Sequence, residues 1–361
     1  MIKHPGRIKV ASFYILTWAV VLPPVLAAFS LIVVSALVYD TLYYPAKHRG
    51  SERLWVQLAR KMYYFYTVNY WQTQRSCVRY DNHLLYVPSK GCTFINPEFS
   101  TRLIFSEDGR VIYSNLNKMG PPILILGDSI TMGWGVNNNE TYSYFMGLGT
   151  SVPILNLGVS SYGTARELLR ASRHSSFRDT KCLLIQYHWN DLEENQQYLT
   201  PRGITPPTRD QFQLLLEHRP KRLSFLQVLA NTARYILRHP LDLYSDLIGR
   251  PRVWKNEEIF GYEPVNFRTH ADYFLQVIGK FPEVRQKMVF VIAGAGISGE
   301  FASALLARPD RPTNVIPIEV DVGADFYTLD THPNKFGHQK IAAQIIEKMK
   351  KSIEGRNCLG L

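Results

Sequence analysis

The chain has 361 residues, enough for one large domain or two small ones with a substantial core. Its hydrophobic content of 46% and charged content of 20% are typical of a globular protein with an added membrane segment. The formal net charge of +11 is spread without a long basic block, which favours anionic membranes or glycans as partners and argues against nucleic acid.

Metal and cofactor motifs are missing from the sequence. There is no zinc-type spacing of cysteine and histidine, and no glycine-rich loop that would bind phosphate. We therefore expect neither a metal ion nor a cofactor.

A long apolar segment lies near the start of the chain. Residues 11–39 contain no charged side chain and are long enough to cross a bilayer, which takes roughly 20 apolar residues. A cleavable signal peptide has an apolar core of about 7–15 residues, so we interpret the segment as an uncleaved single-pass anchor after a tail at residues 1–10. Basic residues flank it on both sides, which leaves its direction open: Lys3, Arg7, Lys9, Lys47, Arg49, Arg53 and Arg60.

Residues 40–120 form a connector rich in tyrosine and basic residues. Within it, residues 53–66 fit a short amphipathic helix that lies near the membrane surface or packs in the core. Cys77 and Cys92 bracket a strand-like run and either form a disulfide or remain free thiols. We predict the disulfide, which requires an oxidising compartment outside the cytoplasm. Cys182 and Cys358 suggest no chemistry.

Residues 121–361 alternate strand and helix patterns, as in a parallel sheet covered on both faces. This pattern predicts an α/β fold, a three-layer flavodoxin-like sandwich with a five-stranded parallel sheet. The interruption at about residues 192–285 is a helical insertion, either an extra layer or a lid or membrane-facing patch. The expected strands are 123–126, 153–157, 182–187, 288–293 and 315–320, with helices at 164–172 and 335–352.

The first of these strands ends at Gly127-Asp128-Ser129. A small residue there lets the backbone turn sharply and leaves a serine at the carboxyl end of the strand, where open α/β sheets bind ligands. Ser129 is therefore a candidate nucleophile, provided that a base and an oxyanion site lie downstream.

Four blocks in order resemble the SGNH, or GDSL, hydrolase family: residues 127–136, 156–163, 189–191 and 330–338. Members are esterases, lipases, deacetylases of carbohydrate or peptidoglycan, and some acyltransferases. The resemblance covers residues from about 121 to the end. Two features depart from the family: His188 stands where a glycine is usual, and one residue separates Asp330 from His332 where two are usual.

The chemistry of these residues fits a serine hydrolase. His332 would remove the proton of Ser129, and Asp330 would orient and stabilise the imidazole. The oxyanion donors would be the N–H groups of Ser129 and Gly158 and the side-chain amide of Asn190, because all three follow predicted strands. We expect an extended backbone at His332, with a helix starting just beyond Pro333.

Other residues leave alternatives open. Asp325 and Asp321 compete with Asp330 as the acid of the triad. His188 either lines the pocket or fills the place of the glycine, and His338 is expected to pack against the last helix.

The resulting hypothesis is a membrane-anchored serine hydrolase that cleaves acyl esters, on glycans or lipids, outside the cytoplasm. One alternative is an O-acyltransferase that uses the same triad to acetylate polysaccharide or peptidoglycan. Another is a non-catalytic accessory subunit bound to a membrane-protein partner.

Overall fold

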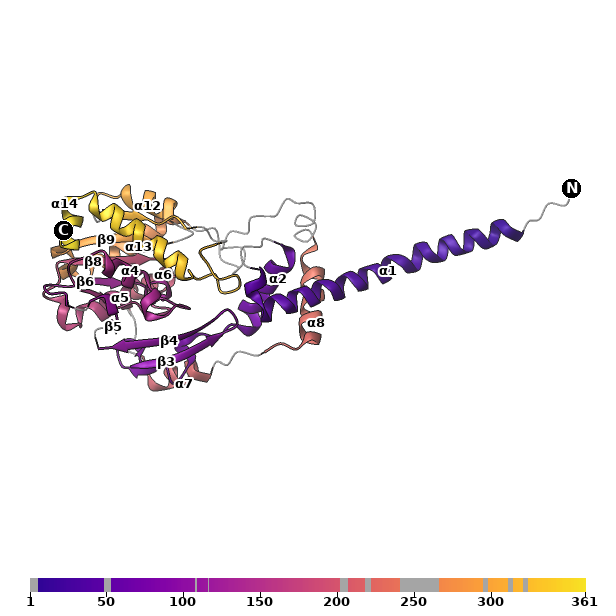
Figure 1. The fold of residues 1–361 in the computed structure, drawn as a ribbon, viewed down its shortest axis with the longest axis horizontal. Helices are drawn as coiled ribbons and strands as arrows, with labels where there is room; N and C mark the ends of the chain where they lie inside the picture. Colours follow the sequence, from indigo (N-terminus) through magenta and orange to yellow (C-terminus); the bar gives the residue numbers. More distant parts are fainter. Residues whose placement is uncertain are drawn as a thin grey trace.

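The structure is a computed structural model that describes residues 6–48, 53–107, 109–115, 117–201, 207–217, 222–240, 266–294, 298–310, 314–320 and 324–361. Side chains of the first helix are described from Val20 onward. Figure 1 shows a long N-terminal helix that projects from a folded body. Asp321, one of the two aspartates that compete with Asp330 as the acid of the triad, lies outside the described residues. Residues 241–265 of the insertion also lie outside them.

The body is built on one eight-stranded sheet with the order β10-β9-β8-β6-β7-β5-β4-β3. Strands β6 to β10 pair in parallel, and β3, β4 and β5 add to the sheet in antiparallel orientation. The parallel strands are β6 (Ile123–Leu126), β7 (Ile154–Asn156), β8 (Cys182–Tyr187), β9 (Met288–Ala293) and β10 (Asn314–Pro317). The antiparallel strands are β3 (Gly91–Asn96), β4 (Phe99–Ser106) and β5 (Gly109–Arg110).

The prediction of a five-stranded parallel sheet is therefore corrected to a larger mixed sheet. The three extra strands come from the segment interpreted as a connector. In β4, buried and exposed residues alternate, which is the pattern of an antiparallel strand with one face on the core. The boundary expected at residue 120 thus falls between strands that share one sheet.

Helices cover both faces of the parallel strands (Figure 1). Side chains of β6 alternate between the two faces: Leu124 and Leu126 enter one core cluster, Ile123 and Ile125 the other. The first cluster includes α5 (Thr164–Ser172), α11 (Phe267–Gly279) and α12 (Ser298–Leu306). The second includes α4 (Tyr142–Leu148), α13 (Lys335–Lys350) and α14 (Ile353–Leu359).

Two disulfides join parts of this body. Cys77 is bonded to Cys92, as predicted, and links the two-stranded sheet of β1 (Val78–Asp81) and β2 (Leu85–Pro88) to β3. Cys182 is bonded to Cys358, a pair that the sequence reading did not foresee, and links β8 to α14. All four cysteines of the chain are thus paired.

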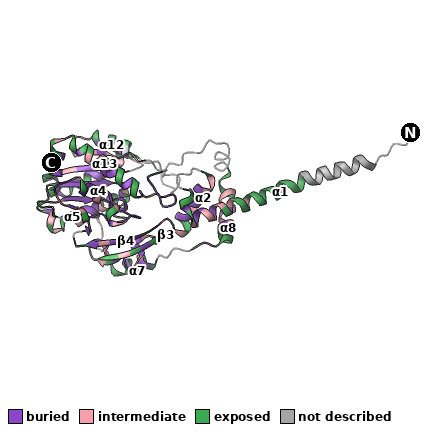
Figure 2. Cartoon of the chain, in the orientation of Figure 1, coloured by how far each residue is buried: buried purple, intermediate pink, exposed green. Residues whose placement is uncertain are grey.

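Helix α1 (Gly6–Tyr43) is longer than the expected anchor and continues into the body. Its Val20–Tyr43 stretch has a mean hydropathy of 2.5 and is mostly exposed, so it is a candidate membrane span by length and composition; an N-terminal signal sequence would pass the same test. Figure 2 shows the exposed part of α1 outside the body. The last turns pack on α2 (Leu54–Met62) and α8 (Phe225–Arg238) through Val38, Leu42 and their neighbours.

The predicted helix at residues 53–66 is α2 followed by a π-helix, η2 (Tyr63–Thr67). Its buried face packs against α1, so the core-packing interpretation is the one observed. The insertion contains α6 (Asp191–Leu199), α7 (Arg209–Glu217), α8 and α11 among the described residues. Short 3₁₀ helices are η1 (Pro45–His48), η3 (Trp71–Thr73), η4 (Tyr113–Asn115), η5 (Asn138–Glu140), η6 (Ser175–Phe177) and η7 (Pro282–Gln286).

Candidate active site

Ser129 is the first residue of the short helix α3 (Ser129–Met132), directly after β6. Asp128 caps this helix by accepting a hydrogen bond from the N–H of Ile130 at 2.9 Å. Gly127 makes the turn with φ of +156°, and a Cβ there would lie 2.1 Å from Oγ1 of Thr131. Glycine is therefore required at this position, and the sharp turn presents Ser129 beyond the carboxyl end of the strand.

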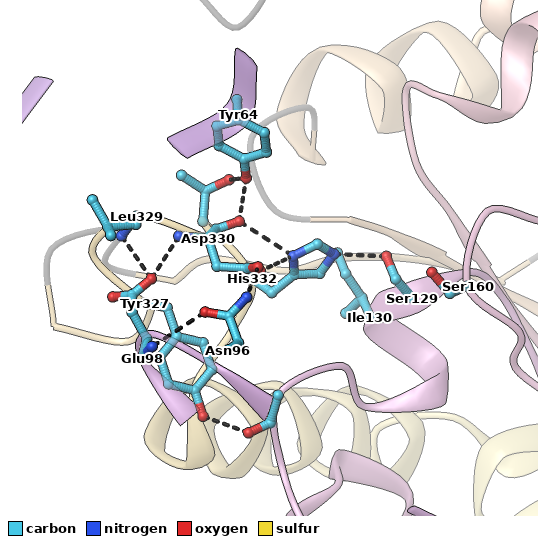
Figure 3. A network of polar contacts seen from close by, with 12 residues as sticks. Tyr64, Asn96, Glu98, Ser129, Ile130, Ser160, Tyr327, Leu329, Asp330 and His332 are labelled. Atoms are coloured by element: carbon cyan, nitrogen blue, oxygen red, sulfur yellow. Dashed lines mark hydrogen bonds and ion pairs between the residues drawn. The ribbon is translucent and has the colours of Figure 1, made fainter. Parts of the chain in front are cut away.

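Three of the predicted site residues lie in hydrogen-bond contact (Figure 3). Oγ of Ser129 is 2.7 Å from Nε2 of His332. Nδ1 of the same ring is 2.5 Å from Oδ1 of Asp330. With Nδ1 protonated, the ring donates to Asp330 and accepts from Ser129, which is the geometry that base-assisted attack by a serine needs.

The electrostatics of the site act on His332 in opposite directions. Burial disfavours the charged imidazole, but the charge of Asp330 and its hydrogen bonds outweigh this effect and raise the pKa of His332 above its usual value. The charge of Asp128 contributes in the same direction. The site therefore stabilises an imidazolium, the form that His332 would take after accepting a proton from Ser129.

The backbone turns sharply between the acid and the histidine. Thr331 has φ of +56°, in the left-handed region that a β-branched residue rarely adopts. This turn brings the side chains of Asp330 and His332 together despite their short spacing. Pro333 pairs with Phe326 in an isolated bridge, and the helix begins at Lys335 with Asn334 as its cap, because the Asn334 side chain satisfies the first N–H groups.

Asp325 is an alternative to Asp330 as the acid of the triad, but its carboxylate interacts with a lysine. Its Oδ2 is 2.7 Å from Nζ of Lys340, and its backbone carbonyl accepts from Asn334. His338 lies within α13 and is buried, and its Nδ1 accepts from the N–H of Tyr142 at 3.2 Å. Burial lowers the pKa of His338 to about 3, so this ring is a neutral packing residue.

The two expected backbone donors differ in their surroundings. Ser129 begins a helix, so its N–H has no partner within that helix. The N–H of Gly158 donates to Oδ1 of Asn156 at 3.0 Å. A Cβ at Gly158 would lie 2.5 Å from the backbone nitrogen of Met132, so glycine permits close packing against α3. An oxyanion would have to share the Gly158 N–H with Asn156.

Asn190, the third expected donor, is exposed and interacts with His188. Nδ1 of His188 lies 2.8 Å from Oδ1 of Asn190, which leaves the Nδ2 group as the donor end of the amide. Burial lowers the pKa of His188, so the ring is neutral and can donate from Nδ1. His188 thus orients the Asn190 side chain.

Buried acids lie beneath the site. Burial raises the pKa of Glu167 and of Asp191, and the negative charges of Asp128 and Glu194 raise both further. The charge of Asp191 also raises the pKa of Glu167. The protein environment therefore favours the protonated form of both carboxyl groups. In the described part of the chain, no group of three or more histidine, cysteine or acidic side chains could hold a metal ion.

Several contacts of Asp330 come from residues that the sequence reading did not identify. Tyr63 and Asn96 donate to Oδ2 of Asp330, Tyr64 donates to its backbone carbonyl, and Glu98 accepts from its N–H. All four precede the segment that resembles a hydrolase. The sequence held one indication of these contacts, because Glu98 is an isolated acidic residue in a strand-rich segment.

Comparisons with known proteins give no family assignment. No family model and no curated protein matches the chain. Among solved structures, a protein described as lipolytic and of the G-D-S-L family, from Desulfitobacterium hafniense DCB-2, is 12% identical with a TM-score of 0.28, covering 62% of this chain and 97% of its own. A carbohydrate esterase family 2 enzyme with a carbohydrate-binding domain, from Corynascus thermopiles (Myceliophthora fergusii), is 12% identical with a TM-score of 0.34, over 74% and 75%.

A third structure, LAE5, an alpha/beta hydrolase enzyme from the metagenome of Lake Arreo, Spain, is 16% identical with a TM-score of 0.30, over 67% of this chain and 97% of its own. At these identities and TM-scores the similarity establishes no family. The class defined by the chain itself is an α/β protein with a mostly parallel sheet and a serine, a histidine and an aspartate in contact at the end of its first parallel strand.

Proposed function

We propose that the protein is a membrane-anchored serine hydrolase that cleaves acyl esters through Ser129, His332 and Asp330. The observation that carries this proposal is the pair of contacts on His332, 2.7 Å to Ser129 and 2.5 Å to Asp330. The resemblance of four sequence blocks to SGNH hydrolases supports the same class.

The reaction follows from these contacts. His332 takes the proton of Ser129 through Nε2 while Oγ bonds to the ester carbonyl carbon. The N–H of Ser129, the N–H of Gly158 (shared with Asn156) and Nδ2 of Asn190 donate to the oxyanion of the tetrahedral intermediate. As the intermediate collapses, the alcohol leaves with the proton from His332, and the acyl group stays on Ser129. Water, activated by the same ring, then releases the acid; a sugar hydroxyl in place of water would make the protein an acyltransferase.

The proposed place of action is the outer face of a membrane. Two disulfides are expected only in an oxidising compartment. Helix α8, which packs on α1, exposes Leu226 and Leu237, and the range 222–240 contains basic but no acidic residues. An apolar and basic helix beside a membrane span suits an anionic bilayer surface.

The proposal is tested with purified full-length protein in detergent. A fluorophosphonate probe should label Ser129, identified by peptide mass spectrometry, and a panel of acyl esters should be hydrolysed. Product analysis with and without a glycan acceptor separates hydrolysis from acyl transfer. Failure of both labelling and turnover in the folded protein would favour the non-catalytic accessory role. A fragment starting at residue 41 would lack Val38, which is fully buried against α2 and α8, so the full chain is preferable.

We predict that Asn190→Ala lowers kcat by about 10²–10³ with a smaller change in KM, because its amide acts mainly on charge in the transition state. Asn190→Asp is the matched control: it keeps the size of the side chain and removes the donor, so it should be at least as impaired. A normal kcat in both variants would remove Asn190 from the oxyanion site.

We also predict that the folded body lies outside the cytoplasm with both disulfides formed. Mass spectrometry of non-reduced peptides should recover the Cys77–Cys92 and Cys182–Cys358 pairs. A reporter that is active only outside the cytoplasm, fused after Leu361, should give signal. A cytoplasmic reporter signal would contradict the proposed side of the membrane.

A further inference from the structure

The short loop that carries Asp330 is held by residues far away in the sequence. From α2 and η2, Nε of Arg60 donates to the carbonyl of Thr328 at 2.8 Å, and the hydroxyl of Tyr63 donates to Oδ2 of Asp330 at 2.6 Å. The Tyr64 hydroxyl contacts both the carbonyl of Asp330 and, at 2.5 Å, Oγ1 of Thr331. These contacts hold the loop from one side.

The β3–β4 hairpin holds the same loop from another side (Figure 3). The Glu98 carboxylate accepts from the N–H groups of Thr328 at 2.5 Å, Leu329 at 2.8 Å and Asp330 at 2.6 Å. Nδ2 of Asn96 lies 3.3 Å from Oδ2 of Asp330 and also donates to the Tyr63 hydroxyl. Burial and the Asp330 charge raise the pKa of Glu98 to about 7, although the three N–H groups lower it.

The two oxygens of the Asp330 carboxylate have different partners. Oδ1 faces Nδ1 of His332, while Oδ2 is occupied by Tyr63 and Asn96. Burial and the charge of Asp330 raise the pKa of Tyr63 well above its usual value, so its hydroxyl remains a donor. Donors on Oδ2 prevent the carboxylate from rotating and keep Oδ1 directed at the imidazole.

The conformation of Thr331 indicates that these contacts are necessary. A non-glycine residue with φ of +56° is strained, and such strain persists only where the surroundings determine the backbone. The surroundings in this case are Tyr64 on Thr331 itself and Glu98 on the three preceding N–H groups. Without them the loop would relax, and Asp330 would move away from His332.

We propose that Tyr63, Asn96 and Glu98 are positioning residues for Asp330, so that the segment before residue 121 completes the active site. The expected effect of these residues on kcat rests on the proposed function. Their expected effect on the placement of Asp330 against His332 does not depend on turnover.

The test compares two tyrosines of the same segment that each donate one hydrogen bond of 2.6 Å. Tyr63 donates to Asp330, and Tyr80 donates to the carbonyl of Pro207, away from the site. In the full chain, Tyr63→Phe should lower kcat by roughly tenfold or more with little change in KM, because a hydrogen bond to a charged group is lost where no substrate binds. Tyr80→Phe should leave kcat unchanged.

A proton NMR measurement gives a readout that does not depend on turnover. The proton between His332 Nδ1 and Asp330 is expected to resonate far downfield because the two atoms are 2.5 Å apart. Its resonance should shift or broaden in Tyr63→Phe but not in Tyr80→Phe. Glu98→Gln, which replaces an acceptor oxygen by an NH₂ group facing the loop, should produce the same change. If Tyr63→Phe does not fold, the Glu98→Gln variant tests the positioning role in its place.

The outcomes separate the two proposals. An unchanged downfield resonance and kcat in folded Tyr63→Phe and Glu98→Gln would overturn the positioning role. Equal losses in Tyr63→Phe and Tyr80→Phe would also overturn it, because they would indicate general destabilisation. If Ser129→Ala hydrolyses esters as fast as the unaltered protein, the proposed function fails, and the resonance alone decides the positioning role.

Discussion

Ser129→Ala is expected to remove ester hydrolysis by several orders of magnitude while leaving the fold intact. The substitution deletes the atom that would form the acyl-enzyme, and the loss of a triad serine elsewhere costs about 10⁶ in kcat. The fold should survive because the turn depends on Gly127 and on the Asp128 cap, and neither uses the hydroxyl of Ser129. The measurement is kcat for a simple acyl ester, with the melting temperature as a check on folding.

Ser160→Ala is a suitable control for this variant. Ser160 is also buried, and its hydroxyl lies 3.5 Å from Oε1 of Gln72; among the described residues it makes no hydrogen bond to His332. It should retain most of the activity and all of the fluorophosphonate labelling. Full activity in pure, folded Ser129→Ala protein would refute the proposed mechanism.

Asp330→Asn is expected to have the second largest effect, a loss of about 10⁴ in kcat. An asparagine side chain at the triad acid favours the wrong imidazole tautomer and no longer stabilises the imidazolium. The substitution also changes the pH dependence. Asp330 raises the pKa of His332, so its removal should lower that pKa and move the acidic limb of the kcat/KM profile to lower pH.

The matched control is Asp325→Asn, which removes the competing carboxylate. Asp325 pairs with Lys340, so this variant should lose some stability and retain the wild-type position of the acidic limb. If Asp325→Asn abolished turnover and Asp330→Asn did not, the assignment of the acid would be wrong.

Local sequence patterns were sufficient to predict the parallel strands and two residues that contact His332, namely Ser129 and Asp330. Runs such as Ile123–Leu126 are apolar on both faces, and a strand buried on both sides requires that composition. The extra strands β3 to β5 were not predicted. They pair with one another locally, but only β5 pairs with β7, so their place in the main sheet depends on a contact between distant segments. The Cys182–Cys358 disulfide spans 176 residues and is likewise visible only in the folded chain.

The loop at Asp330 shows why backbone geometry was the least predictable part of the site. A proline after His332 favours extended backbone by local sterics, and that reasoning predicted an extended histidine. The proline rule does not apply to the preceding Thr331, which the fold holds in a left-handed conformation through Tyr64 and Glu98. These tertiary contacts come from residues 63–98, and nothing near residue 330 in the sequence indicates them.

Because α1 is one continuous helix, it would fix the distance between the membrane and the active site of the proposed enzyme. The helix enters the body without a break, and Val38, Leu42 and Tyr43 are held by α2, α8 and the carbonyl of Leu223. With the N-terminal part of α1 in a bilayer, helix geometry rather than the length of a flexible tether would set the height of Ser129 above the lipid. Such an enzyme would work within a thin layer at one depth, which suits esters that are themselves immobilised at the membrane surface more than esters free in solution.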